Sequence, residues 1–253
     1  MGVRHKQGKN GGFTIIEVML FLGITGLLAL TLLGGWTTMI NTQRYKDSVK
    51  TVQSFLQTQY NLVHNVENVK QADGGPYCDV NASDEPRFVT AQMPRGQSDC
   101  IQMGRLVHIS NGTQIRSYAI VGADLANTAT TDAAEIIRRN PIVVDGELQL
   151  SDSELSVPWQ AEVVNRRNIG GIQNVALAII RSPLTGSVHT YRVSTDGVNL
   201  PDVESMIAVA NEQEVNLCLD PGVAFSGNRI GVAIRERASA QSFVQIIQDE
   251  TLC

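Results

Sequence analysis

The longest apolar run of the chain lies close to its N-terminus. Residues 13–35 contain one ionisable side chain, that of Glu17, and the preceding residues 1–12 carry three cations and no acid. As a helix these 23 residues would span roughly 34 Å, which is enough to cross the hydrocarbon core of a bilayer. Basic residues beside a span stay on the cytoplasmic side. The pattern therefore predicts a single-pass membrane protein with a cytoplasmic N-terminus and an exported C-terminus.

Residues 36–72 continue with a different periodicity. Apolar residues recur there at steps of three or four positions, or at the sum of the two, and polar residues fill the positions between them. The stripe comprises Val49, Val52, Leu56, Val63 and Val66, widened by Phe55, Leu62 and Val69. This is the pattern of an amphipathic helix, which Asp73-Gly74-Gly75-Pro76 would end. We expect its apolar stripe to pack on the protein's own sheet.

After residue 76, short apolar or alternating runs are separated by turn residues, a pattern typical of strands. The runs are Arg87–Met93, Ile101–Ser110, Gln114–Val121, Pro141–Leu150, Val175–Arg181, Val188–Ser194, Glu214–Asp220, Arg229–Glu236 and Ser242–Gln248. Asn111-Gly112 separates the second run from the third and predicts a hairpin. The Ala-rich residues 123–140 predict a helix.

The fold class expected from these elements is α+β. A long N-terminal helix, membrane-spanning in its first half and amphipathic in its second, would pack on a β-rich globular head. The head would cover residues 73–253 as one domain. Residues near 123–170 are the candidate for an inserted subdomain within this head.

Composition supports this division of the chain. The 253 residues are 43% hydrophobic and 18% charged, with a formal net charge of −5, which excludes a disordered chain, a collagen-like chain and a disulfide-dense mini-protein. A mean hydropathy near zero hides the contrast between the apolar run and the rest. Without the three cations of the leader, residues 13–253 carry about −8. An acidic body argues against nonspecific nucleic-acid binding through net charge, and the sequence demonstrates no nucleic-acid partner.

Two ordinary explanations of the N-terminus fit poorly. A cleaved secretory signal has an apolar core of about 7–15 residues followed by a small-residue cleavage site, whereas this run is longer and lacks that site. A plain membrane anchor accounts for the length but not for Gly11-Gly12 directly before the run. Nor does it account for Glu17, since a carboxylate inside a span costs on the order of 2.5–3.5 kcal/mol near the centre.

The segment Gly12-Phe13-Thr14-Ile15-Ile16-Glu17-Val18 resembles the processing and methylation motif of type IV pilins and pseudopilins. The resemblance covers roughly a tenth of the chain, and it combines the leader, the glycine, the Phe, the Glu spacing and the apolar run. It implies that a prepilin peptidase cuts between Gly12 and Phe13 and that Phe13 is then N-methylated. Residues 1–12 would be the cleaved leader, residues 13–35 the filament-core helix, and residues 36–72 its amphipathic continuation.

The resemblance gives Glu17 a role in filament assembly. Cleavage would leave a cationic α-amine on Phe13, and an unpaired charge is strongly unfavourable in an apolar bundle. The resemblance implies that Glu17 of one subunit meets the amine of a neighbour. The alternative is a helix-start acid favoured by the macrodipole. Gly34, followed by Gly35, stands where many pilins have a proline. This pair would either soften the helix or allow close helix–helix approach, and both interpretations stay open.

Four cysteines follow the apolar run: Cys78, Cys100, Cys218 and Cys253. An even number in an exported domain suggests two disulfides, and the lack of C-x-x-C spacing argues against a zinc or thioredoxin-like site. Three pairings are possible, and four free thiols are the alternative. We favour Cys78–Cys100 and Cys218–Cys253, because each closes a local segment and the second ties down the last residue.

Motifs for catalysis are lacking in the sequence. The four histidines are scattered without metal-ligand spacing, and there is no nucleophile elbow, so we expect no enzyme, no metal and no other cofactor. The hypothesis is a structural subunit of a type IV pilus-like filament, a minor pilin by its size, in adhesion, motility or DNA uptake. Its partners would be other pilin subunits, prepilin peptidase and the pilus assembly machinery in the membrane. The alternatives are a pseudopilin of a secretion system and a membrane-anchored exported binding domain.

Overall fold

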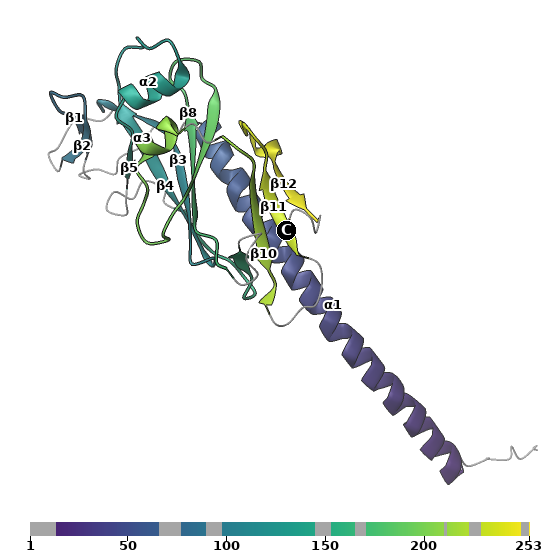
Figure 1. Cartoon of the computed structure of the whole chain (residues 1–253). Coiled ribbons are helices and arrows are strands. Elements are labelled where there is room, and N and C mark those ends of the chain that lie inside the picture. Colours follow the sequence, from purple (N-terminus) through teal and green to yellow (C-terminus); the bar gives the residue numbers. More distant parts are fainter. Residues whose placement is uncertain are drawn as a thin grey trace, which may run out of the picture. The chain divides into compact units, whose positions relative to one another are not determined.

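A computed structural model describes the chain at residues 14–65, 77–89, 98–144, 153–164, 171–209, 212–222, 229–248 and 253. The chain divides into two compact units, Met1–Gln43 and Arg44–Cys253. One long helix, α1 (Ile15–His64), contributes to both of them (Figure 1). The class is α+β: an N-terminal apolar helix followed by a β-rich head of antiparallel sheets.

Within its described residues, the N-terminal unit is the first part of α1. The stretch Ile15–Leu33 is long and apolar enough to cross a membrane, judged by length and composition alone. None of this stretch is buried, and large side chains such as Phe21 and Leu30 stand 66% and 73% exposed. The apolar surface predicted from the sequence is therefore exposed among the residues that the structure describes.

The head contains three antiparallel sheets in the part that the structure describes (Figure 1). The largest has the order β5 (Ile142–Val144), β4 (Gln114–Ala123), β3 (Cys100–Ser110), β8 (Val175–Arg181) and β9 (Val188–Ser194), and β6 (Ser153–Ser156) also pairs with β4. A four-stranded sheet has the order β12 (Val244–Ile247), β11 (Ile230–Ile234), β10 (Val215–Asp220) and β7 (Glu162–Val164). The third is the hairpin of β1 (Tyr77–Val80) and β2 (Pro86–Val89).

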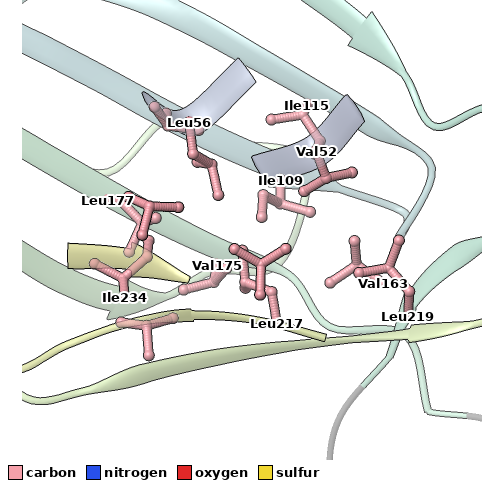
Figure 2. Packing of buried hydrophobic residues seen from close by; sticks show 14 of the residues in the cluster. Val52, Leu56, Ile109, Ile115, Val163, Val175, Leu177, Leu217, Leu219 and Ile234 are labelled. Carbon is pink, nitrogen blue, oxygen red and sulfur yellow. The ribbon is translucent and has the colours of Figure 1, made fainter. Parts of the chain in front are cut away.

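The largest apolar cluster of the head joins the second part of α1 to both larger sheets (Figure 2). Val52 and Leu56 are completely buried in it. They pack with Ile109, Ile115, Val175 and Leu177 from one sheet and with Val163, Leu217, Leu219 and Ile234 from the other. The described residues of the predicted stripe, Val49, Val52, Leu56 and Val63, are all buried, as expected. Two tyrosines, Tyr45 and Tyr60, extend the stripe on the same helix.

Strand β8 shows why the six-stranded sheet is apolar on both faces. Its odd-numbered residues Val175, Leu177 and Ile179 belong to the cluster around α1, and its even-numbered residues to a second cluster. That second cluster includes residues of two short helices, α2 (Asp132–Arg138) and α3 (Val203–Ala208). Because successive side chains of a strand point to opposite faces, helices cover both sides of this sheet, and β8 reads as a continuous apolar run.

Most of the predicted strands are present, often with shorter bounds. Strands β3 and β4 match the predicted hairpin, with Ser110 paired to Gln114 at the turn. Several predicted elements extend into residues outside those that the structure describes, among them Arg87–Met93, Pro141–Leu150, the helix over residues 36–72 and the subdomain near residues 123–170. Within the described part, α1 ends at His64. The subdomain stays a prediction.

The helix expected over residues 123–140 is wrong for its first half. Strand β4 runs on to Ala123, and α2 begins only at Asp132, after an N-cap in which Thr131 accepts a hydrogen bond from the N–H of Ala134. Ala-rich composition favours a helix, but the residues between are held in an extended path by the side chain of Arg139. Its guanidinium donates to the carbonyls of Ala123 and Leu125.

The predicted strand Arg229–Glu236 is also too long, since β11 ends at Ile234. The missed elements are short: β1, β6, β7 and α3 have three to six residues each. Elements of this length carry too few residues for a period of 2 or 3.6 to stand out.

Candidate functional site

The start of α1 is fixed by a hydrogen bond between its backbone and a side chain that precedes it. Thr14 Oγ1 accepts from the N–H of Glu17 at 3.3 Å, and the Thr14 carbonyl accepts from the N–H of Val18 at 3.2 Å. Thr-x-x-Glu is the spacing of a capping box. The sequence analysis treated Thr14 only as part of the family motif, although this spacing is a local signal for a helix start.

Glu17 consequently lies in the first turn of α1 with its side chain exposed. The N-terminal end of a helix carries a partial positive charge, which favours a carboxylate there. The carboxylate is thus held at the beginning of the apolar stretch. Gly12 and Phe13, the predicted cleavage and methylation residues, lie outside the described residues.

The polar side chains within the apolar stretch are satisfied by the helix itself. Thr25 Oγ1 donates to the carbonyl of Phe21 at 2.8 Å, and Thr31 Oγ1 donates to the carbonyl of Leu28 at 2.9 Å. A hydroxyl bonded to its own helix can enter an apolar phase without a lost hydrogen bond. The stretch is therefore compatible with lipid or with other apolar helices around it.

The helix runs without interruption through Gly34 and Gly35. A Cβ added at Gly35 would meet nothing within 4 Å. The chain itself does not require a glycine at position 35, so neither softness nor close approach to another helix is excluded as its use.

Two disulfides join the cysteines in the pairs that the sequence analysis favoured. Cys78 of β1 is bonded to Cys100 at the start of β3, with Cα atoms 5.8 Å apart. Cys218 of β10 is bonded to Cys253, with Cα atoms 5.4 Å apart. The second bridge lies against Gly231 of β11, where an added Cβ would come within 2.6 Å of the Cys253 sulfur and 2.7 Å of the Leu217 carbonyl oxygen. Disulfides persist in oxidising compartments, which fits an exported head.

The three histidines of the head have separate environments. His64 donates through Nε2 to the carbonyl of Ser239 at 2.7 Å, and the pKa of His108 is lowered by burial. His189 places Nε2 3.0 Å from a carboxylate oxygen of Asp132 and Nδ1 3.0 Å from one of Glu212. Among the residues that the structure describes, no group of three or more His, Cys, Asp or Glu is placed to hold a metal ion.

A second ionic cluster lies at α2. The buried carboxylate of Glu135 accepts from Arg138 at 2.6 Å and from Arg139 at 3.1 Å. The hydrogen bond from Arg138 is the main cause that lowers the pKa of Glu135 to about 2, and backbone N–H groups of Ala129 and Thr128 add to it against the opposing effect of burial. This cluster fixes the path of the chain between β4 and α2 and offers no open reactive group.

A broad hollow lies beside α1 and opens to solvent. It is lined by Asp47, Lys50, Thr51, Ser54, Phe55 and Leu155. This lining contains no histidine or cysteine and no enclosed acid–base pair, so the hollow lacks the features of an enzyme active site.

Comparisons with known proteins give no family for the chain. No protein-family model, no curated protein and no solved structure matches it. What the geometry itself defines is a protein with one exposed apolar N-terminal helix and a disulfide-containing β-rich head.

Proposed function

We propose that the protein is a structural subunit of a type IV pilus-like filament, processed by prepilin peptidase and assembled through α1. The observation that supports the proposal is the start of α1, where Thr14 caps the backbone N–H of Glu17 and the exposed Glu17 carboxylate stands at the beginning of an apolar stretch that none of the described residues buries. A soluble protein has no use for such a surface. A bilayer before assembly and neighbouring helices after assembly would each cover it.

Processing explains why a carboxylate would stand at this point. Cleavage after Gly12 leaves a charged amine at Phe13, four positions before Glu17. In a bundle of packed helices, the Glu17 carboxylate of one subunit neutralises the amine of the next and so removes two unpaired charges from an apolar interior.

The head fits the exported side of this scheme. Its two disulfides favour an oxidising compartment, and its size favours a minor pilin over a major one. We propose a cytoplasmic N-terminus in the stored form and an extracellular or periplasmic filament as the assembled form. The process served would be adhesion, motility or DNA uptake, with a pseudopilin of a secretion system as the alternative within the same class.

The N-terminus of the mature protein tests the proposal directly. Mass spectrometry of the protein recovered from membranes or filaments should find a chain that begins with N-methylated Phe13. An intact Met1 in the functional protein would overturn the proposal and leave a membrane-anchored exported domain in its place.

Variants of Glu17 test the assembly step separately. Glu17→Ala should leave membrane insertion and cleavage intact but prevent the chain from entering filaments. Asp47→Ala is the matched control, because Asp47 is an exposed acid on the same helix beyond the apolar stretch, and it should assemble normally. Equal incorporation of the two variants would remove the proposed role of Glu17.

A further inference from the structure

The loop after β6 contains a tight turn whose two central residues, Trp159 and Gln160, are of types that rarely adopt its backbone conformation. The N–H of Ala161 donates to the carbonyl of Pro158 at 3.3 Å, and both central residues have a positive φ, 61° at Trp159 and 58° at Gln160. Two left-handed central residues are the mark of a type I′ turn, in which Asn and Gly are strongly preferred. A bulky aromatic residue at positive φ is an outlier.

The apolar core of the head does not require an indole at this turn. Val157 and Ala161, at either end, are buried, whereas the side chain between them points out and Trp159 is 55% exposed. Strained backbone that presents an exposed side chain is more frequent at functional positions than elsewhere.

The turn is held by α1. Ser48 Oγ donates to the carbonyl of Pro158 at 2.9 Å, and the guanidinium carbon of Arg44 lies 4.8 Å from the centre of the Trp159 ring. A cation over an indole face is an attractive contact that also fixes both groups. The exposed indole is thus held beside Arg44 and Ser48 of α1.

That position is where the charge-free part of α1 ends. Residues 18–43 contain no ionisable side chain, and Arg44 lies 27 positions after Glu17. As a helix, an uncharged run of this length is long enough to cross the hydrocarbon core of a bilayer, which is about 30 Å thick. Arg44 is the first charged side chain after that run, so we expect it at the headgroup level. Trp, Tyr, Arg and Lys are the residues that gather at this level of membrane proteins.

The charge next to the turn suits phosphate groups. Arg44 is followed on α1 by the exposed cations Lys46 and Lys50, against the single exposed acid Asp47. We infer that the Trp159 turn and Arg44 form a lipid-headgroup contact on the head, which steadies the subunit on the exported face of the membrane before assembly. This inference rests on the membrane insertion of α1 in the proposed function.

The chain offers a direct test because it has only two tryptophans, Trp36 and Trp159. The Trp36→Phe protein, in vesicles of phosphatidylcholine and phosphatidylglycerol, reports on Trp159 alone. Its fluorescence should be quenched more by a nitroxide on the lipid headgroup than by one at mid-chain. Arg44→Gln in this background should reduce the headgroup quenching. Emission from Trp159 that ignores the headgroup nitroxide would overturn the inference.

The Trp159→Phe protein is the control that separates the two proposals. Trp36 lies eight positions before Arg44 on the same helix, so it should be quenched more strongly by the mid-chain nitroxide if α1 is inserted. Quenching of Trp36 without quenching of Trp159 would reject the headgroup contact and leave insertion standing. If Trp159 were shielded from solvent only in filaments, and not in vesicles, the headgroup contact would also be rejected, and the result would indicate a contact between subunits. Loss of quenching for both would reject insertion.

Two glycine variants of the turn separate loss of the lipid contact from a change in the folding of the turn. Trp159→Gly relieves one left-handed residue but removes the contact with Arg44, whereas Gln160→Gly relieves one and keeps that contact. Hydrogen exchange of residues 157–161 is compared for each variant with and without vesicles. Vesicles should slow the exchange in Gln160→Gly but not in Trp159→Gly. Equal slowing by vesicles in the two variants would overturn the contact.

Discussion

The hydroxyl of Tyr60 on α1 lies 2.8 Å from Thr190 Oγ1 on β9, and Thr190 Oγ1 lies 2.8 Å from the carbonyl oxygen of Ala238. A threonine hydroxyl has one proton, and the carbonyl can only accept it. Tyr60 must therefore donate to Thr190. The chain of two hydrogen bonds is buried and links the long helix, the edge of the six-stranded sheet and the segment before β12.

We expect Tyr60→Phe to reduce the free energy of unfolding of the head by about 1–2 kcal/mol, because the Thr190 oxygen then loses its buried donor. Burial raises the pKa of Tyr60 well above its usual value, so the phenol stays a donor throughout the physiological range. Thermal and denaturant unfolding of the full chain in micelles measures the change. In a cycle with Thr190→Val, a coupling energy close to zero would contradict a stabilising hydrogen bond between Tyr60 and Thr190.

Gly231 should tolerate no side chain. An added Cβ would lie 2.6 Å from the Cys253 sulfur and 2.7 Å from the carbonyl oxygen of Leu217, so the disulfide or the β10–β11 pairing must shift. Gly231→Ala should cost about 1–3 kcal/mol of stability, the usual range for overpacking. Gly35→Ala is the matched control, since an added Cβ there meets nothing and unfolding of the head should not change. Equal melting of the two variants would show that β11 adjusts freely.

The two disulfides should contribute similar stability. Their sequence separations are 22 for Cys78–Cys100 and 35 for Cys218–Cys253. Because the entropy of loop closure grows only with the logarithm of length, each should stabilise by about 3 kcal/mol and the two should differ by only about 0.4 kcal/mol. Paired Cys→Ser variants compared by denaturant unfolding measure this. A difference of several kcal/mol would mean that one bridge acts through native-state packing instead.

Local patterns along the chain predicted those parts of the fold that depend on sequence neighbours. The apolar stripe of α1 reflects burial of one face of the helix. The continuous apolar run of β8 reflects burial of both faces of its sheet. The apolar run that follows Glu17 is equally local, whereas the cap by Thr14 was not predicted although its spacing is a local signal. The preferred cysteine pairs rested on short loops, and these are the pairs in the structure.

What the sequence could not predict depends on contacts between distant residues. The path before α2 is set by Arg139, whose partners include the carbonyls of Ala123 and Leu125, and Ala-rich composition pointed to a helix instead. The Trp159 turn gave no signal because Pro-Trp-Gln-Ala contains none of the residues that such turns prefer. It forms because Ser48 and Arg44 of α1 hold it.

The carboxylate of Glu135 should give the head a distinct response to acid. Its pKa falls from 4.5 to about 2 in the folded protein, first through the hydrogen bond from Arg138. A lowered folded-state pKa means that the stabilisation is complete above about pH 4.5 and is lost as the pH falls toward 2. The shift corresponds to about 3 kcal/mol. The melting temperature of the full chain, followed between pH 6 and pH 2, should fall across this window.

Glu135→Gln isolates this effect. The variant should be less stable than the parent at pH 6, because Arg138 and Arg139 lose their buried counter-charge, and the gap between the two proteins should narrow as the pH approaches 2. Glu154→Gln serves as a control, because that carboxylate pairs with Arg116 only at 3.4 Å and is half exposed, so it should follow the parent at every pH. A constant gap for Glu135→Gln across the window would mean that packing, and not the charge, carries its contribution.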